Sequence, residues 1–127
     1  ENLLTIEDNL RLFDLVDEKN FSCLYDTQNY WNSKGWHQPA MLRQLIEHEI
    51  LYPEIHVKDG IDKIDSCSYL GEGESDFAGT IEVLKKGGYS GWLHLEKFYD
   101  REPLGSTMDS YLDVAKKDLE ILRKACS

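Results

Sequence analysis

Basic residues and long hydrophobic runs are scarce in this sequence. Lys and Arg number 14 against 24 Asp and Glu in 127 residues, which gives a formal net charge of −10. Nucleic acids and anionic membranes are bound through a basic face, so the shortage argues against either partner. No apolar run approaches the roughly 20 residues of a membrane-spanning helix. We also expect no signal peptide, because no apolar stretch near the start follows basic residues.

Cysteine is also scarce. The sequence has only Cys23, Cys67 and Cys126. An odd number argues against a disulfide framework, and their separation does not match the spacing of metal-ligand motifs. The pattern predicts free thiols in a reducing cytoplasm.

Alternating helical and strand patterns fill the chain. With 41% hydrophobic residues, it is long enough for one hydrophobic core, and we expect a single domain over residues 1–127. The expected strands cover residues 21–25, 54–58 and 92–96, and the expected helices begin near Thr5, Pro39, Phe77 and Tyr111. Strands that alternate with helices predict an α/β fold with parallel strands and right-handed crossovers.

Local signals fix several helix ends. Thr5 is a typical N-cap, Pro39 suits the first turn of a helix, and Gly87-Gly88 is a typical helix end. The expected apolar face of the last helix consists of Tyr111, Leu112, Ala115, Leu119 and Leu122. We expect the charged residues Lys116, Lys117, Asp118 and Glu120 of the same helix to face solvent.

Four potential metal ligands lie at the expected strand ends. Asp26, His56 and Glu96 each lie at or near the end of an expected strand, and Glu1 precedes the first helix, where another strand would end. Parallel strands bring their carboxyl ends to one face, where α/β proteins bind ligands. Three carboxylates and an imidazole suit a divalent ion, with Mn²⁺ or Mg²⁺ favoured over Co²⁺ or Zn²⁺. Solvated residues at strand ends are the plainer alternative.

Four motifs carry a resemblance to a known family. They are residues 25–29 (YDTQN), 55–60 (IHVKDG), 70–77 (LGEGESDF) and 88–96 (GYSGWLHLE). In this order they resemble the sugar phosphate isomerase/epimerase family of the xylose isomerase-like TIM-barrel superfamily. The resemblance implies the C-terminal half of an eight-stranded barrel, about strands five or six to eight. Its partner would be the N-terminal half-barrel or a second copy of the chain.

The resemblance also implies roles for single residues. Glu1, Asp26, His56 and Glu96 match the metal ligands of the family, and Glu1 and Glu96 match its two catalytic carboxylates. Many members have a histidine three residues after the aspartate ligand, where this sequence has Asn29. Asparagine can hydrogen-bond a substrate hydroxyl but cannot be assumed to replace that histidine.

The chemistry implied by this family is proton transfer beside a keto group, through a metal-stabilised enediolate, in a small sugar or sugar phosphate. Isomerisation and epimerisation would use the same residues, and the sequence does not separate them. The sequence also does not identify the sugar or the metal.

The aromatic loop after Asp26 supplies further substrate-contact candidates. Trp31, Trp36 and His37 could line a sugar pocket. Loop packing or an oligomer contact is an equally good explanation for the two tryptophans, and His37 is more simply a surface histidine. Among basic residues near the strand ends, Lys58, Lys97 and Arg101 could contact a substrate phosphate or pair with carboxylates. For Lys58 we favour pairing, with Asp59 and Glu54 as the partners nearest in sequence.

The glycine-rich segment 70–77 has two interpretations. Glycines before a helix can bind phosphate through backbone amides. Three acidic residues crowd this segment, however, so we favour a loop that ends in a helix cap at Ser75 or Asp76.

Three alternative functions remain open at this point. The chain could be a non-catalytic half-barrel fragment or an assembly module. A keto-inositol dehydratase would use the same ligands. An apurinic endonuclease-like activity is disfavoured, because such enzymes need more histidine ligands and a basic groove, and this chain has four histidines.

Overall fold

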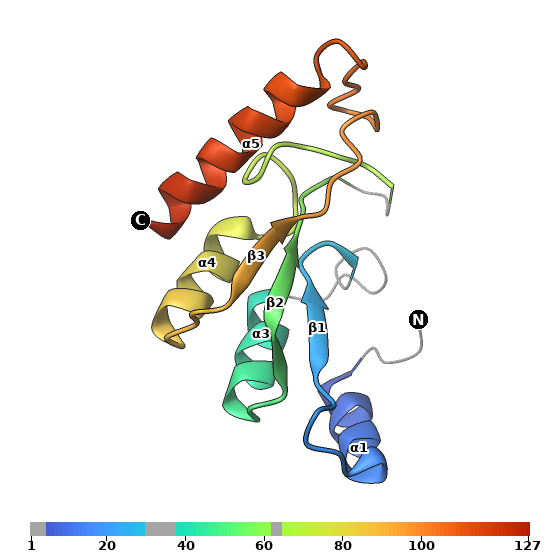
Figure 1. The fold of residues 1–127 in the computed structure, drawn as a ribbon, viewed down its shortest axis with the longest axis vertical. Helices are drawn as coiled ribbons and strands as arrows, with labels where there is room; N and C mark the ends of the chain where they lie inside the picture. Colours follow the sequence, from blue (N-terminus) through green and yellow to red (C-terminus); the bar gives the residue numbers. More distant parts are fainter. Residues whose placement is uncertain (1–4, 30–37, 62–64) are drawn as a thin grey trace.

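The structure, a computed structural model, describes residues 5–29, 38–61 and 65–127 (Figure 1). Strands and helices alternate along the chain, as the sequence predicts. The elements in order are α1 (Ile6–Val16), β1 (Cys23–Asp26), α3 (Gln38–Glu47), β2 (Leu51–Val57), α4 (Phe77–Lys86), β3 (Trp92–Leu95) and α5 (Tyr111–Cys126).

The three strands form one parallel sheet in the order β1-β2-β3. Asp26 is aligned with His56, and His56 is aligned with His94 on the other side. All three strands run toward the top of Figure 1, so their carboxyl ends lie together. The predicted α/β class, with parallel strands and intervening helices, is confirmed.

Strand β2 begins earlier than predicted. The sequence places Pro53 before the strand, whereas the structure places it inside, two residues after the strand start at Leu51. A proline fits there only if the hydrogen-bond ladder is interrupted. The register shows that interruption, because Cys23 pairs with Leu51 while Tyr25 pairs with Ile55. Proline has no N–H to donate, so it is tolerated at such an irregularity.

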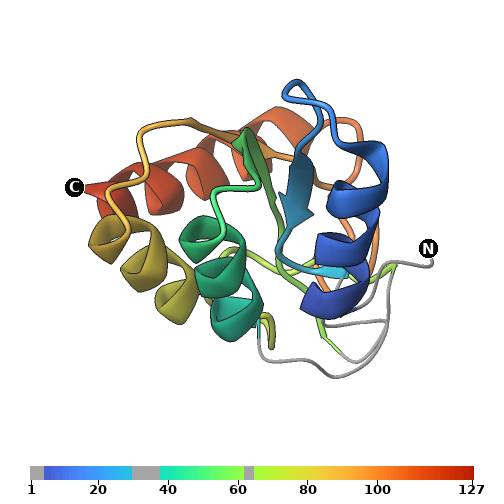
Figure 2. The same cartoon turned by 90° about the horizontal axis from the view of Figure 1, so that it is seen from below.

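The hydrophobic core lies between the sheet and the helices. Tyr25, Ile55 and Val57 on the sheet are fully buried, together with Leu42 and Leu45 of α3. Figure 2 shows α1, α3 and α4 side by side along one face of the strands. Alternation along a strand sends every second side chain to this face and the others to the opposite one.

The opposite face of the sheet, called the open face below, carries exposed apolar side chains among the described residues. Trp92 is 74% exposed, and Leu24 and Tyr52 are 46% and 43% exposed. The sequence hypothesis of a half-barrel predicts such a face, because the interior of a barrel is filled by side chains from all its strands.

The predicted helix ends are confirmed. Thr5 Oγ1 accepts a hydrogen bond from the Asp8 amide at 2.9 Å. Asp76 caps α4 by accepting from the Gly79 amide at 3.1 Å. Gly87 follows the last turn of α4, and Gly88 has a φ of +65°, a conformation that glycine adopts without strain.

The cysteines are free thiols, as predicted, with Cys23 and Cys67 buried and Cys126 exposed. Within the described ranges, none of the helices combines the length and apolar character required to cross a bilayer.

Candidate metal centre

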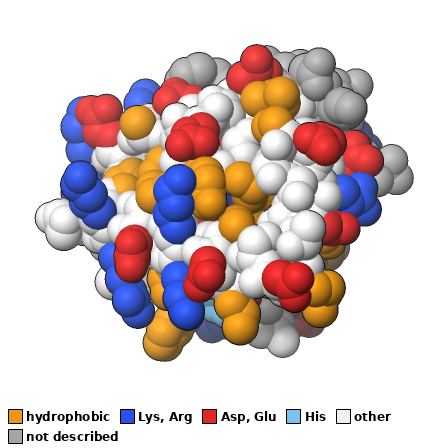
Figure 3. Space-filling view, turned by 90° about the horizontal axis from the view of Figure 1, so that it is seen from above, with side chains coloured by type: hydrophobic (Ala, Val, Ile, Leu, Met, Phe, Trp, Pro, Cys, Tyr) orange, Lys and Arg blue, Asp and Glu red, His pale blue; other side chains and the backbone are white. Residues whose placement is uncertain are grey.

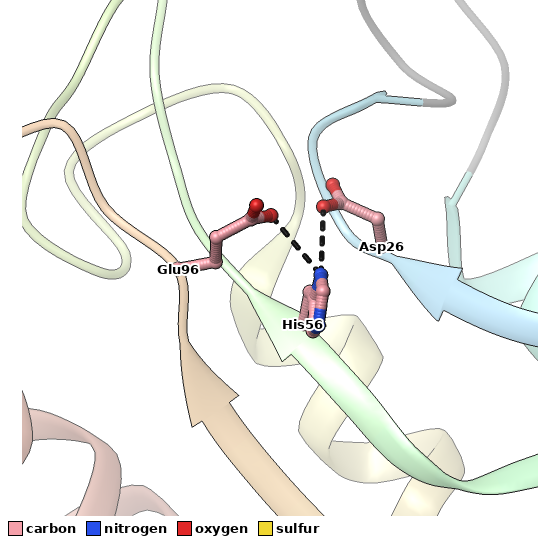
Figure 4. Close-up of side chains that lie close together, drawn as sticks. All are labelled: Asp26, His56 and Glu96. Carbon is pink, nitrogen blue, oxygen red and sulfur yellow. Dashed lines mark ion pairs between the residues drawn. The ribbon is translucent and has the colours of Figure 1, made fainter.

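Asp26, His56 and Glu96 converge at the carboxyl ends of the three strands (Figure 4). Asp26 ends β1, His56 is the penultimate residue of β2, and Glu96 directly follows β3. His56 Nδ1 lies 3.0 Å from Glu96 Oε2 and 3.9 Å from Asp26 Oδ2. One ligand atom from each residue lies within 4.8 Å of the others, close enough for the three to share one ion.

Two backbone amides fix the Asp26 carboxylate. Its Oδ1 accepts hydrogen bonds from Gln28 N at 2.9 Å and Asn29 N at 2.8 Å. The other oxygen, Oδ2, is therefore turned toward His56. Burial raises the pKa of Asp26, and this outweighs the lowering by the amides and by the charge of Lys58.

Lys58 lies between the two carboxylates of this cluster. Its Nζ is 2.9 Å from Asp26 Oδ2 and 2.6 Å from Glu96 Oε2. Burial opposes the charged ammonium, but the hydrogen bond to Glu96 and the charge of Asp26 together raise the pKa of Lys58. The hydrogen bond from Lys58 lowers the pKa of Glu96. Lys58 thus forms ion pairs, but not with the partners nearest in sequence.

The Asp26 Oδ2 atom is a candidate ligand atom for an ion. It is buried, and among the described residues it accepts no hydrogen bond of good geometry, although Lys58 Nζ is within ion-pair distance. We interpret the contact as charge attraction without proper donor alignment. A buried carboxylate oxygen, an imidazole and a second carboxylate together form a suitable donor set for a divalent metal.

Glu54 and His94 lie behind His56 on the open face of the sheet. Glu54 Oε1 is 3.8 Å from His56 Nε2 and 3.5 Å from His94 Nδ1. The His56 and His94 rings are stacked, with centroids 6.5 Å apart. The Glu54 carboxylate therefore faces the side of His56 that points away from Asp26 and Glu96.

The family model that describes the xylose isomerase-like TIM barrel matches residues 1–125. The chain belongs to this family. The parallel strands, their intervening helices and the cluster at the strand ends agree with part of such a barrel.

Two solved structures share the fold. A xylose isomerase domain protein from Alicyclobacillus acidocaldarius subsp. acidocaldarius aligns with a TM-score of 0.70 and 23% identity, over 96% of this chain and 43% of that protein. A xylose isomerase domain protein from Planctomyces limnophilus aligns with a TM-score of 0.63 and 20% identity, over 94% of this chain and 45% of that protein. The chain thus spans less than half the length of either protein. Among curated proteins, none matches the sequence significantly.

The other site residues predicted from the sequence are differently placed. Asn29 adjoins the cluster through its backbone, which donates to Asp26. Arg101 pairs with Asp65 at 2.9 Å and lies 5.7 Å from the Phe98 ring centroid. The predicted candidates Glu1, Trp31, Trp36 and His37 lie outside the described residues.

Lys97 is turned away from the cluster. Its ammonium lies 3.4 Å from Asp118 Oδ2 and donates to the backbone carbonyl of Ser68. The Lys97 and Asp118 side chains are 1% and 0% exposed. The contacts of Lys97 are therefore those of a buried structural ion pair. Its neighbour Glu96 lies on the side of the chain that faces His56, and Lys97 lies on the opposite side.

Asp118 corrects the prediction that the charged residues of the last helix all face solvent. It is fully buried. Its Oδ1 accepts from the Leu70 amide at 2.9 Å, and its Oδ2 accepts from the Tyr99 hydroxyl at 3.3 Å. Leu112, predicted on the apolar face, is instead 70% exposed. The buried stripe of α5 includes Asp118 and Leu122, four residues apart, which places both on one helix face.

Asp59 organises the glycine-rich loop, a role that sequence reasoning missed. Its carboxylate accepts from four backbone amides. The four donors are Gly60, Gly71, Gly73 and Ser75, at 2.8 to 3.1 Å. A Cβ on Gly73 would collide with Asp59 Oδ1, so the close approach requires glycine. The loop ends in a capped helix, and these amides are directed to Asp59, as the non-phosphate interpretation requires.

A separate groove lies elsewhere on the described residues. It has a volume of about 480 Å³ and runs between α3 and α4, lined by residues that include Arg43, Glu47, Glu82 and Lys86. It contains none of the three converging ligands, so we take the strand ends and not this groove as the candidate site. On the face seen from above, acidic and basic side chains are interspersed around apolar ones (Figure 3).

Proposed function

We propose that this chain forms the C-terminal half of a metal-dependent isomerase or epimerase that acts on a sugar or sugar phosphate. Residues 1–127 would constitute one partial barrel domain. Asp26, His56 and Glu96 would hold the ion, with Glu1 as a fourth ligand. The convergence of three ligand atoms within 4.8 Å at the ends of three parallel strands carries this proposal.

The donor set determines which ion suits the site. Two carboxylates and one imidazole, with a third carboxylate from Glu1, favour Mn²⁺ or Mg²⁺ over Co²⁺ or Zn²⁺. When bound, such an ion would polarise a substrate carbonyl and acidify the neighbouring carbon.

The residues of the chain would perform the proton transfers. Glu96 is 42% exposed and ionised at neutral pH, with its pKa lowered by the hydrogen bond from Lys58. It could therefore accept a substrate proton once that hydrogen bond is released. Asp26 is held by two backbone amides and is better suited to binding than to proton transfer. Glu1 would return the proton from the other side of the substrate. Isomerisation and epimerisation both fit these roles.

Thermal unfolding with and without Mn²⁺ or Mg²⁺ tests the site. We expect the ion to raise the melting temperature, because it binds only where the native fold brings the ligands together. His56→Ala should weaken that shift. His48→Ala, at an exposed histidine beyond the end of α3, is the matched control and should retain it. A wild-type melting temperature that neither Mn²⁺ nor Mg²⁺ changes would count against the metal site.

Activity requires the complete barrel. With the remaining strands supplied, Glu96→Gln should abolish the exchange of substrate hydrogen with solvent deuterium on a keto-sugar panel. The Glu96→Gln fold should remain intact by circular dichroism. Exchange at the wild-type rate in Glu96→Gln would remove Glu96 from the proposed mechanism.

A non-catalytic half-barrel or assembly module is the second candidate. The open sheet face, with Trp92 74% exposed and Leu24 46% exposed, supports a role that depends on another half-barrel or a second copy. Sedimentation distinguishes a chain that assembles with a partner from a chain that stays monomeric. A compact monomer at micromolar concentration, with metal bound, would argue against the module.

A further inference from the structure

Lys58 and a metal ion would compete for the same two oxygen atoms. The ammonium contacts Asp26 Oδ2 and Glu96 Oε2, at 2.9 and 2.6 Å. The same two oxygens face His56 Nδ1, at 3.9 and 3.0 Å. They are thus the atoms through which the three ligands converge. A divalent ion and an ammonium cannot both occupy this space, because like charges at such a separation repel strongly.

We propose that Lys58 is an internal counter-ion, which holds the metal-free site together and must be displaced when a divalent cation binds. This inference rests on the metal site of the proposed function. Without an ion, the ammonium keeps Asp26 and Glu96 close despite their like charges. With an ion, that role passes to the metal and the lysine side chain moves away.

The structure provides a destination for the displaced ammonium. Lys58 Nζ is already 5.8 Å from the centroid of the Phe98 ring, and Phe98 is 50% exposed at the edge of the cluster. An aromatic face attracts a cation at this range. Four flexible methylenes let the ammonium leave the carboxylates and approach the ring and solvent without any backbone movement.

Lys97 shows why displacement is specific to Lys58. Its ammonium is tied to Asp118 and to the Ser68 carbonyl, and its side chain is 1% exposed. Lys58 instead contacts Glu96, whose side chain is 42% exposed, and a buried Asp26 oxygen that receives no well-aligned hydrogen bond. An ion entering from the open face reaches Lys58's contacts and not those of Lys97.

Metal titration of Lys58→Met is the first test. Without its competitor, Mn²⁺ should bind about tenfold more tightly than in the wild type, a factor intermediate between exposed and buried ion pairs. In EDTA the variant should melt at a lower temperature, because Asp26 and Glu96 lose their counter-ion. Lys116→Met, at an exposed lysine paired with Asp113, is the control and should bind Mn²⁺ like the wild type.

The outcomes separate this inference from the proposed function. Equal or weaker Mn²⁺ binding by Lys58→Met overturns the counter-ion role and leaves the metal site intact. No binding by either protein removes the metal site and the counter-ion role together. Binding by the variant alone supports Lys58 as the competitor.

Amine labelling of the wild type covers the case in which Lys58→Met does not fold. Reductive methylation followed by peptide mass spectrometry measures the reactivity of each lysine. Mg²⁺ should increase the labelling of Lys58 several-fold and leave buried Lys97 unchanged. His56→Ala should show no such increase. Unchanged labelling of Lys58 at a Mg²⁺ concentration that raises the wild-type melting temperature would overturn the proposal.

Discussion

Lys58 and Lys97 follow adjacent strands of the sheet and both contact carboxylates, yet their surroundings differ. Lys97 lies against Asp118, whose two oxygens also accept from Leu70 N and the Tyr99 hydroxyl. Lys58 lies between Asp26 and Glu96, near a histidine. Both lysines form ion pairs, but only one pair has its remaining acceptors occupied by hydrogen bonds from other elements.

The comparison teaches how to distinguish a structural ion pair from a candidate binding site. A buried charge is tolerated when fixed donors and acceptors satisfy it, as at Asp118 and Asp59. At the strand ends, Asp26 Oδ2 is buried without a well-aligned donor. The two carboxylate oxygens that face each other there have the Lys58 ammonium as their nearest lysine partner, and such a partner can be exchanged for another cation.

The largest effect should come from breaking the Lys97 pair. Asp118→Ala would leave a buried ammonium unpaired and remove the acceptor of Leu70 N, so we expect the free energy of unfolding to fall by about 3–5 kcal/mol. Urea unfolding measures it. Asp113→Ala, which breaks only an exposed pair with Lys116, should change it by less than about 0.5 kcal/mol. Similar losses in both variants would make the structural network of Asp118 no more important than a surface pair.

A smaller effect is expected at Asp59. Asp59→Asn would replace one acceptor oxygen with an amide donor that faces backbone N–H groups, at a cost of about 2 kcal/mol in unfolding free energy. The amides of Gly71, Gly73 and Ser75 should exchange hydrogen faster than in the wild type. Asp109→Asn, at an exposed position, is the control. Unchanged exchange at all three amides would show that Asp59 does not hold the loop.

The smallest effect should appear as a pH dependence at Asp26. Burial raises its pKa in the folded chain. The stability that this group contributes is therefore present below the unfolded pKa of about 3.9 and is lost as pH rises through the higher folded value. In EDTA, the unfolding free energy of the wild type should fall relative to that of Asp26→Asn over this rise. A relative increase with pH would mean that Lys58 outweighs the cost of burying Asp26.

Strand order and the convergence of Asp26, His56 and Glu96 could be predicted because both depend on local patterns. Residues 54, 56 and 58 alternate with buried Ile55 and Val57, and this alternation places His56 and Lys58 on one face. Parallel pairing then aligns Asp26 with His56. The cluster follows from strand direction and period alone.

The partners of the buried charges could not be predicted in the same way. Lys97 and Asp118 are 21 positions apart, and their contact depends on how α5 packs on the end of β3. One signal was available. Asp118 is four residues before Leu122, so it lies on the apolar stripe of the helix and not on its charged face. Proximity in sequence misassigned Lys58, because Asp59 points to the opposite side of the chain.

Two residues of opposite charge follow each of two adjacent strands: Lys58 and Asp59 follow β2, and Glu96 and Lys97 follow β3. Lys58 and Glu96 face the open side with His56, while Asp59 and Lys97 face the loop and α5. A deletion of one residue within β2 or β3 would exchange the two sides and place a charge of the wrong sign in each environment. The lengths of these strands should therefore be more restricted during evolution than most of the side chains within them, because one lost residue would damage the fold and the site in a single step.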